Sequence, residues 1–112
     1  MINEHKFGSF VVDGRSYLGD IKIIMNKVRY WGDRKKHTVS FEDVKELIDS
    51  GAEMIVVGTG NSGYLEVPPE IKDLILGKGM RLFVDINLKA IDKYNELTSQ
   101  NKNVAALFHA TC

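Results

Sequence analysis

From residue 52 onward the chain alternates between short apolar segments and amphipathic ones, and this alternation restricts the possible folds more than any other feature. The apolar segments "EMIVVG", "MRLFVDI" and "NVAALFHA" have the character of strands. Between them, "PPEIKDLILGKG" and "LKAIDKYNELTSQ" have the apolar spacing of helices. This order favours parallel strands joined by right-handed crossovers. We therefore predict an α/β fold.

The N-terminal third is predicted to add antiparallel strands. "FGSFVV" and "RSYLGDIKIIM" flank Asp13-Gly14, a strong two-residue hairpin signal. Asn26-Lys27 offers a weaker second turn before "VRYW". These strands are expected either to join the parallel strands or to form a separate small layer. The predicted sheet is mixed, with an N-terminal antiparallel β-hairpin region.

Helix boundaries are marked by residues with known preferences. Ser40 and Asp43 have the spacing of a capping box at the start of a helix. Pro69 suits the first turn of the next helix, and Gly77 is expected just beyond its end. Asn87 is predicted to cap the last helix.

Length and composition indicate one ordinary globular domain, residues 1–112. Fifteen basic and 15 acidic side chains cancel, which argues against strong non-specific attraction to nucleic acid or membranes. The single cysteine, Cys112, favours a reducing compartment. The first residues lack the apolar core of a signal peptide, and no apolar run approaches the length of a membrane span. We expect a cytoplasmic protein.

The segment after "MIVV" spells Gly58-x-Gly60-x-x-Gly63, the spacing of a dinucleotide-binding turn. Asp85, at the end of the next strand, stands where a ribose-binding acid would lie. That motif needs a helix whose first turn overlaps the last glycines, because its free N–H groups hold the pyrophosphate. Pro68-Pro69 delays the helix, since proline lacks the N–H and restricts the residue before it. We therefore predict no dinucleotide and no other cofactor.

Two interpretations of the glycine turn stay open. The glycines can supply positive φ angles for an open turn and do nothing more. Alternatively, the amides of Gly60, Asn61, Ser62 and Gly63 can form a nest for a carboxylate or phosphate.

Asp20 lies within the otherwise apolar "YLGDIKII". If the carboxylate points inward it needs a hydrogen-bond partner and becomes a candidate functional group. If it follows a bulge at Gly19, its role is structural. The sequence leaves both interpretations open.

His109 and Cys112 suggest a cysteine–histidine dyad, but residues three apart in a strand point to opposite faces. The cysteine also has no electropositive neighbours in the sequence. His5, His37 and His109 are scattered and show no metal-ligand spacing with Cys112. We predict no catalytic dyad and no metal site.

Basic and aromatic side chains are mixed in "KVRYWGDRKKH". Such a mixture can stack on and neutralise nucleic acid, although the neutral net charge makes nucleic acid the least favoured partner. Trp, Tyr and Arg are enriched at the centres of protein interfaces. Arg29, Tyr30, Trp31 and Arg34 are therefore predicted to contact a protein partner, with a homo-oligomer as one form of it.

The chain resembles a family of small stand-alone α/β domains. "FGSFVVDGRSYLGDIKI", "VVGTGNSG", "YNEL" and the terminal "HATC" carry the resemblance, in this order. The family includes the mitochondrial complex I assembly factor three and an adipogenesis-associated cytosolic protein. The resemblance implies a three-layer fold with a central mixed sheet flanked by helices, and a scaffold or assembly role. Its motif residues correspond to Gly14, Tyr17, Asp20, Trp31, Gly58, Gly60, Tyr94, Asn95, His109 and Cys112.

Two positions depart from this family. Asn87 stands where the family usually has Thr, and Lys102 or Asn103 stands where it usually has Arg. A polar pocket built from those groups would be altered in this chain.

Two hypotheses for function follow. The first is a non-catalytic protein-interaction or assembly module, because no nucleophile, base or metal set is evident. The second is a small-anion or small-ligand binding protein, with an enzyme as one form of it. Its ligand would bind at the edge of the sheet where the strands have their carboxyl ends. Its predicted contacts are the Gly58–Gly63 turn, with Asn61 and Ser62, together with Asp20 and His109.

Overall fold

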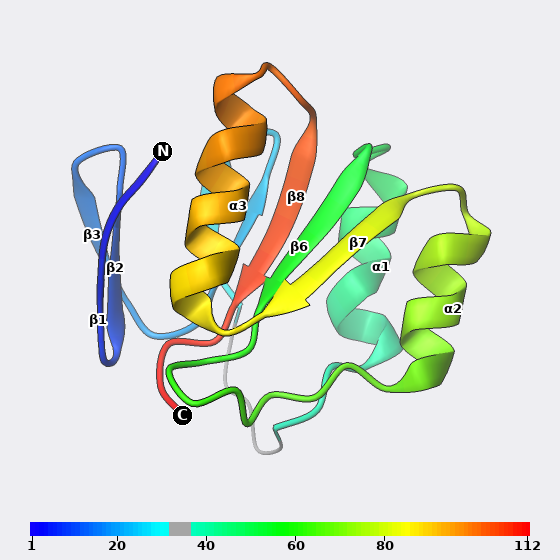
Figure 1. The fold of residues 1–112 in the computed structure, drawn as a ribbon, viewed down its shortest axis with the longest axis horizontal. Helices are drawn as coiled ribbons and strands as arrows, with labels where there is room; N and C mark the ends of the chain where they lie inside the picture. The colour runs from blue at the N-terminus through cyan, green and yellow to red at the C-terminus, as the bar shows by residue number, and fades with distance from the viewer. Residues whose placement is uncertain (32–36) are drawn as a thin grey trace.

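A computed structural model describes residues 1–31 and 37–112 of the protein, and these residues form two sheets and three helices (Figure 1). The small sheet has the order β1-β2-β3, and the large sheet has the order β5-β4-β8-β6-β7. The strands are β1 (Ile2–Lys6), β2 (Ser9–Val12), β3 (Arg15–Leu18), β4 (Ile21–Ile24), β5 (Lys27–Tyr30), β6 (Met54–Gly58), β7 (Arg81–Asp85) and β8 (Val104–Phe108), and the helices are α1 (Phe41–Asp49), α2 (Pro69–Gly77) and α3 (Asn87–Ser99).

The large sheet is the middle of three layers. Helices α1 and α2 cover one face, while α3 and the small sheet cover the other (Figure 1). Strand β6 shows why both faces need cover, since Ile55 and Val57 enter the core beneath α1 and α2, and Met54 and Val56 enter the core beneath α3. Strand β6 is parallel to β7 and β8, whereas β4 is antiparallel to β5 and β8. The predicted mixed α/β fold is confirmed.

The small sheet is separate from the large sheet and is tied to α3. The Asn95 side chain accepts a hydrogen bond from the Ile2 N–H at 2.8 Å and donates one to the Ile2 carbonyl at 2.9 Å. Tyr94, one residue earlier, is buried and packs edge-on against Phe108. Burial raises the pKa of the Tyr94 phenol to about 12, so the group is neutral in the core. The polar sequence of β1 gave no strand signal, because this strand uses only Ile2 for the core.

The turns differ in one place from the sequence prediction. Asp13-Gly14 does join β2 to β3, because Val12 pairs with Arg15. The second turn is Met25-Asn26, one residue earlier than expected, since Ile24 pairs with Lys27. Both turn residues have positive φ angles, 52° and 64°, as a two-residue hairpin that matches the strand twist requires.

The helix starts follow the local signals in two of three cases. The Ser40–Asp43 capping box is present, and α2 begins at Pro69. Asn87 was predicted as a cap, but it is the first residue of α3, and Ile86 occupies the cap position. Gly77 is the last residue of α2 and does not lie beyond its end. The strand predicted over "NVAALFHA" ends at Phe108, so residues 109–112 are not part of a strand.

Candidate functional site

The ends of β6 and β8 bring the glycine turn and residues 109–112 together. Gly58 pairs with Phe108 in parallel register, so the chain segments that follow both strands leave the sheet at one edge. Figure 1 shows the C-terminal end beside the loop after β6. The loop that joins the two sheets also reaches this edge and contributes Asp20.

The amides of the glycine turn hold the chain's own last residues. The Asn61 N–H donates to the Thr111 carbonyl at 2.8 Å, and the Ser62 N–H donates to the backbone oxygen of Cys112 at 3.0 Å. The Tyr64 N–H donates to that same oxygen at 3.3 Å. Gly60 has a φ of 104°, and a Cβ at this residue would lie 2.3 Å from the Cys112 carbonyl carbon. Two of the four amides predicted to form a nest, those of Asn61 and Ser62, therefore donate to backbone oxygens of this chain.

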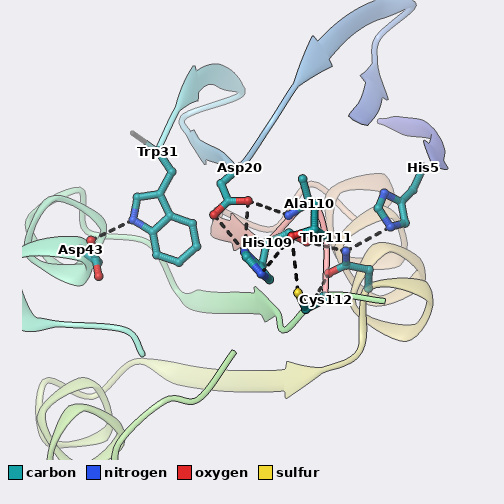
Figure 2. Close-up of polar contacts among 10 residues, drawn as sticks. His5, Asp20, Trp31, Asp43, His109, Ala110, Thr111 and Cys112 are labelled. Atoms are coloured by element: carbon teal, nitrogen blue, oxygen red, sulfur yellow. Dashed lines mark hydrogen bonds and ion pairs between the residues drawn. The ribbon is translucent and has the colours of Figure 1, made fainter. Parts of the chain in front are cut away.

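Asp20 points inward and contacts two groups of the C-terminal segment. Its carboxylate oxygens lie 3.0 and 3.1 Å from His109 Nδ1, and one of them accepts the Ala110 N–H at 2.7 Å (Figure 2). The side chains of His109 and Asp20 are only 8% and 11% exposed. A carboxylate this far from water needs such partners, so the pairing explains why an acid interrupts an apolar stretch.

The carboxylate determines which nitrogen of His109 carries the proton. An oxygen acceptor on Nδ1 favours a proton there, which leaves the lone pair on Nε2. His109 Nε2 lies 3.4 Å from the Thr111 hydroxyl, and that hydroxyl lies 3.9 Å from Cys112 Sγ. Figure 2 shows this row of groups at the end of β8. The unprotonated nitrogen thus faces the thiol and hydroxyl side of the segment.

A second histidine completes a cluster at this edge. The His37 ring stands edge-on to the His109 ring with 5.2 Å between their centroids. One donor atom from each of His37, His109 and Cys112 lies within 4.8 Å of the other two. The expectation that His109 and Cys112 point to opposite faces is wrong, because β8 ends before both residues. Sequence spacing could not show that His37 belongs to this cluster, since the pairing of its segment with Glu66 brings it here.

Asn87 links the turn, the last strand and α3. Its buried side chain accepts the Gly60 N–H at 3.1 Å and donates to the His109 carbonyl at 2.6 Å. His5 reaches the same region, with Nε2 2.6 Å from Asn61 Oδ1. The other departure from the family pattern, Lys102 or Asn103, lies at the opposite end of β8, where the Asn103 N–H donates to Glu53. The two departures therefore do not share a pocket.

The residues predicted for a protein interface face different ways. The Trp31 indole N–H donates to Asp43 at 2.9 Å, and its ring packs on the core beneath α1 (Figure 2). Arg29 pairs with Glu46, and hydrogen bonds from Lys22 and then Arg29 lower the pKa of the Glu46 carboxyl. Tyr30 is 59% exposed. Arg34 lies outside the described residues.

The fold and this edge define a class: a three-layer α/β domain with clustered polar groups at the carboxyl ends of parallel strands. The chain matches the family described as a protein of unknown function (DUF498/DUF598) over residues 2–109, and it belongs to that family.

Solved structures share the whole fold. The conserved hypothetical protein PH1505 from Pyrococcus horikoshii OT3 superimposes with a TM-score of 0.85 at 25% identity, over 100% of this chain and 99% of that one. A protein named MT938 gives a TM-score of 0.80 at 30% identity, over 100% and 98% of the two chains. A protein from Bartonella henselae, named an outer membrane protein, gives 0.85 at 23% identity over 99% and 94%, which shows the fold alone. In this chain, within residues 1–31 and 37–112, no helix has the length and apolar character to cross a membrane.

Proposed function

We propose that the protein binds a small ligand at the edge formed by residues 109–112 and the glycine turn. The observation that carries this proposal is the contact of the Asp20 carboxylate with both His109 Nδ1 and the Ala110 N–H. This pairing orients a histidine lone pair toward the thiol and hydroxyl at the chain's last residues. A buried carboxylate that orients a histidine is typical of binding and catalytic sites.

The side chains, and not the glycine amides, are the proposed ligand contacts. The amides of Asn61 and Ser62 already donate to Thr111 and Cys112, so an incoming anion would have to displace these oxygens. The turn instead serves as the support that places Cys112 beside His109. Gly58 contributes by close packing, because a Cβ there would lie 2.4 Å from the Phe108 ring.

A ligand panel tests this proposal. Phosphates, carboxylates, nucleotides and divalent metal ions are added separately to the untagged chain, and melting temperature and amide resonances are recorded. At least one class is expected to raise the melting temperature by mass action and to move resonances of residues 109–112. Cys112→Ser should abolish both effects, while the exposed substitution Lys89→Ala should leave them unchanged. If no class of the panel moves these resonances, the proposal is wrong.

A second candidate function is docking of an acidic protein segment. A cleft of about 480 Å³ separates the small sheet from β5, the edge strand of the large sheet. Arg15, Lys27 and Arg29 line it, and an edge strand can pair with an extended peptide. The motif resemblance to an assembly factor supports this candidate.

The docking candidate has its own test. A short acidic peptide with high β propensity should move the amide resonances of β5 in the wild-type chain and less in Lys27→Glu. Equal shifts in both proteins, or none in either, would reject it.

A further inference from the structure

We propose that His37, His109 and Cys112 form a zinc-binding site. This proposal rests on the proposed function, because it places zinc at the same edge of the sheet. The three donor atoms come from two distant segments, the residues before α1 and those after β8, and lie within 4.8 Å of one another. Imidazole nitrogen and thiolate sulfur are the ligands that zinc prefers in proteins. On binding, the Cys112 thiol releases its proton to solvent, and the sulfur donates an electron pair to the metal.

The distances are close to those that a bound ion requires. Zinc lies about 2.1 Å from nitrogen and 2.3 Å from sulfur, which places the donors of a tetrahedral site roughly 3.4–3.7 Å apart. Contraction from the present separation needs movements of only about 1 Å. The His37 side chain is exposed and Cys112 is partly exposed, so both are free of the core packing that would oppose such a movement.

Asp20 accepts the hydrogen bond that a zinc-bound histidine usually donates from its other ring nitrogen. A metal-ligating histidine commonly donates its other ring N–H to a carboxylate, which fixes the tautomer and the ring orientation. His109 has this arrangement, with Nδ1 3.0 Å from Asp20 Oδ2 and Nε2 on the side of Cys112. The carboxylate is therefore a positioning group and not a ligand.

The backbone on both sides of the cluster is held by hydrogen bonds. The His37 carbonyl accepts the Glu66 N–H at 2.8 Å, and the Val39 N–H donates to the Glu66 carbonyl at 2.8 Å. The backbone of Thr111 and Cys112 is held by the glycine turn. These bonds place the ligands before any metal arrives, which lowers the entropic cost of binding.

The ligand set favours zinc over hard cations and leaves one position open. Magnesium and calcium prefer oxygen ligands, and none of the three donors is oxygen. Three protein ligands fill three of the four positions of tetrahedral zinc, as in catalytic sites, whereas structural sites use four. The open position is where water or a small anionic ligand would bind.

The test measures zinc binding to the untagged, reduced chain by competition with a chromophoric chelator, and cobalt binding by absorption. We expect one ion per chain, with a thiolate-to-cobalt charge-transfer band and d–d bands of tetrahedral intensity. His37→Gln and Cys112→Ser should each lower zinc affinity by on the order of 100-fold or more, and Asp20→Asn by about 10- to 100-fold. Lys89→Ala, an exposed substitution outside the cluster, should bind zinc as the wild-type chain does.

Three outcomes would overturn the zinc site: less than half an ion bound per chain, a cobalt complex without the charge-transfer band, or unchanged affinity in Cys112→Ser and His37→Gln. If a non-metal ligand from the panel still moves residues 109–112 while zinc does not bind, the zinc site fails and the small-ligand proposal stands. If neither binds, both fail.

Discussion

Replacing Gly60 with alanine is expected to lower the free energy of unfolding by about 2 kcal/mol or more and to release residues 109–112 from the glycine turn. Two effects combine at this residue. Its φ of 104° is unfavourable for any residue with a Cβ, and the added carbon would lie 2.3 Å from the Cys112 carbonyl carbon. One of these atoms is a Cβ and the other is a backbone carbon, so a change of rotamer cannot relieve the contact. Urea unfolding measures the loss.

Gly79→Ala is the matched control for Gly60→Ala. Gly79 also has a positive φ, 79°, but a Cβ there would meet no atom within 4 Å. This variant should show only the backbone cost, about 1 kcal/mol. Equal losses in the two variants would mean that the C-terminal segment does not lie against Gly60.

Replacing Asp20 with alanine is expected to destabilise the protein by about 2–6 kcal/mol, because two buried donors lose their acceptor at a cost of about 1–3 kcal/mol each. The Ala110 N–H and His109 Nδ1 would both lose their acceptor. Asp49→Ala is the control, since Asp49 is exposed and, among residues 1–31 and 37–112, pairs with Lys45 in an i,i+4 contact. That variant should cost about 0.3–0.5 kcal/mol. Thermal and urea unfolding measure both.

The double variant Asp20→Ala with His109→Ala measures the interaction energy between the two side chains, apart from the contacts that each makes with other groups. If the two side chains interact as the distances indicate, the double variant should be more stable than the sum of the single losses implies. Additive losses would contradict a direct contact between Asp20 and His109.

Features that depend on neighbouring residues were predictable from the sequence. The capping box at Ser40 and the late start of α2 at Pro69 rest on backbone chemistry within a few residues. The apolar run of β6 likewise predicted a parallel strand. A strand that is buried on both faces appears in the sequence as a continuous apolar run.

The site could be predicted only in part, since its contacts span the chain. Asp20 and His109 were both candidates, but nothing local relates residues 20 and 109. His37 was considered as a metal ligand and rejected on spacing, because its place beside His109 depends on pairing with Glu66. Asn87 was mistaken for a cap, since its side chain bonds the glycine turn and the His109 carbonyl instead of its own helix.

Amide hydrogen exchange at Asn61 and Ser62 tests most directly whether the amides of the glycine turn are hydrogen-bonded to Thr111 and Cys112. Both residues are exposed, so only donation to Thr111 and Cys112 would slow their exchange. We predict protected amides at both positions in the wild-type chain and loss of that protection in Gly60→Ala. Exchange of these two amides at the rate of an unstructured peptide in the wild-type protein would contradict the account.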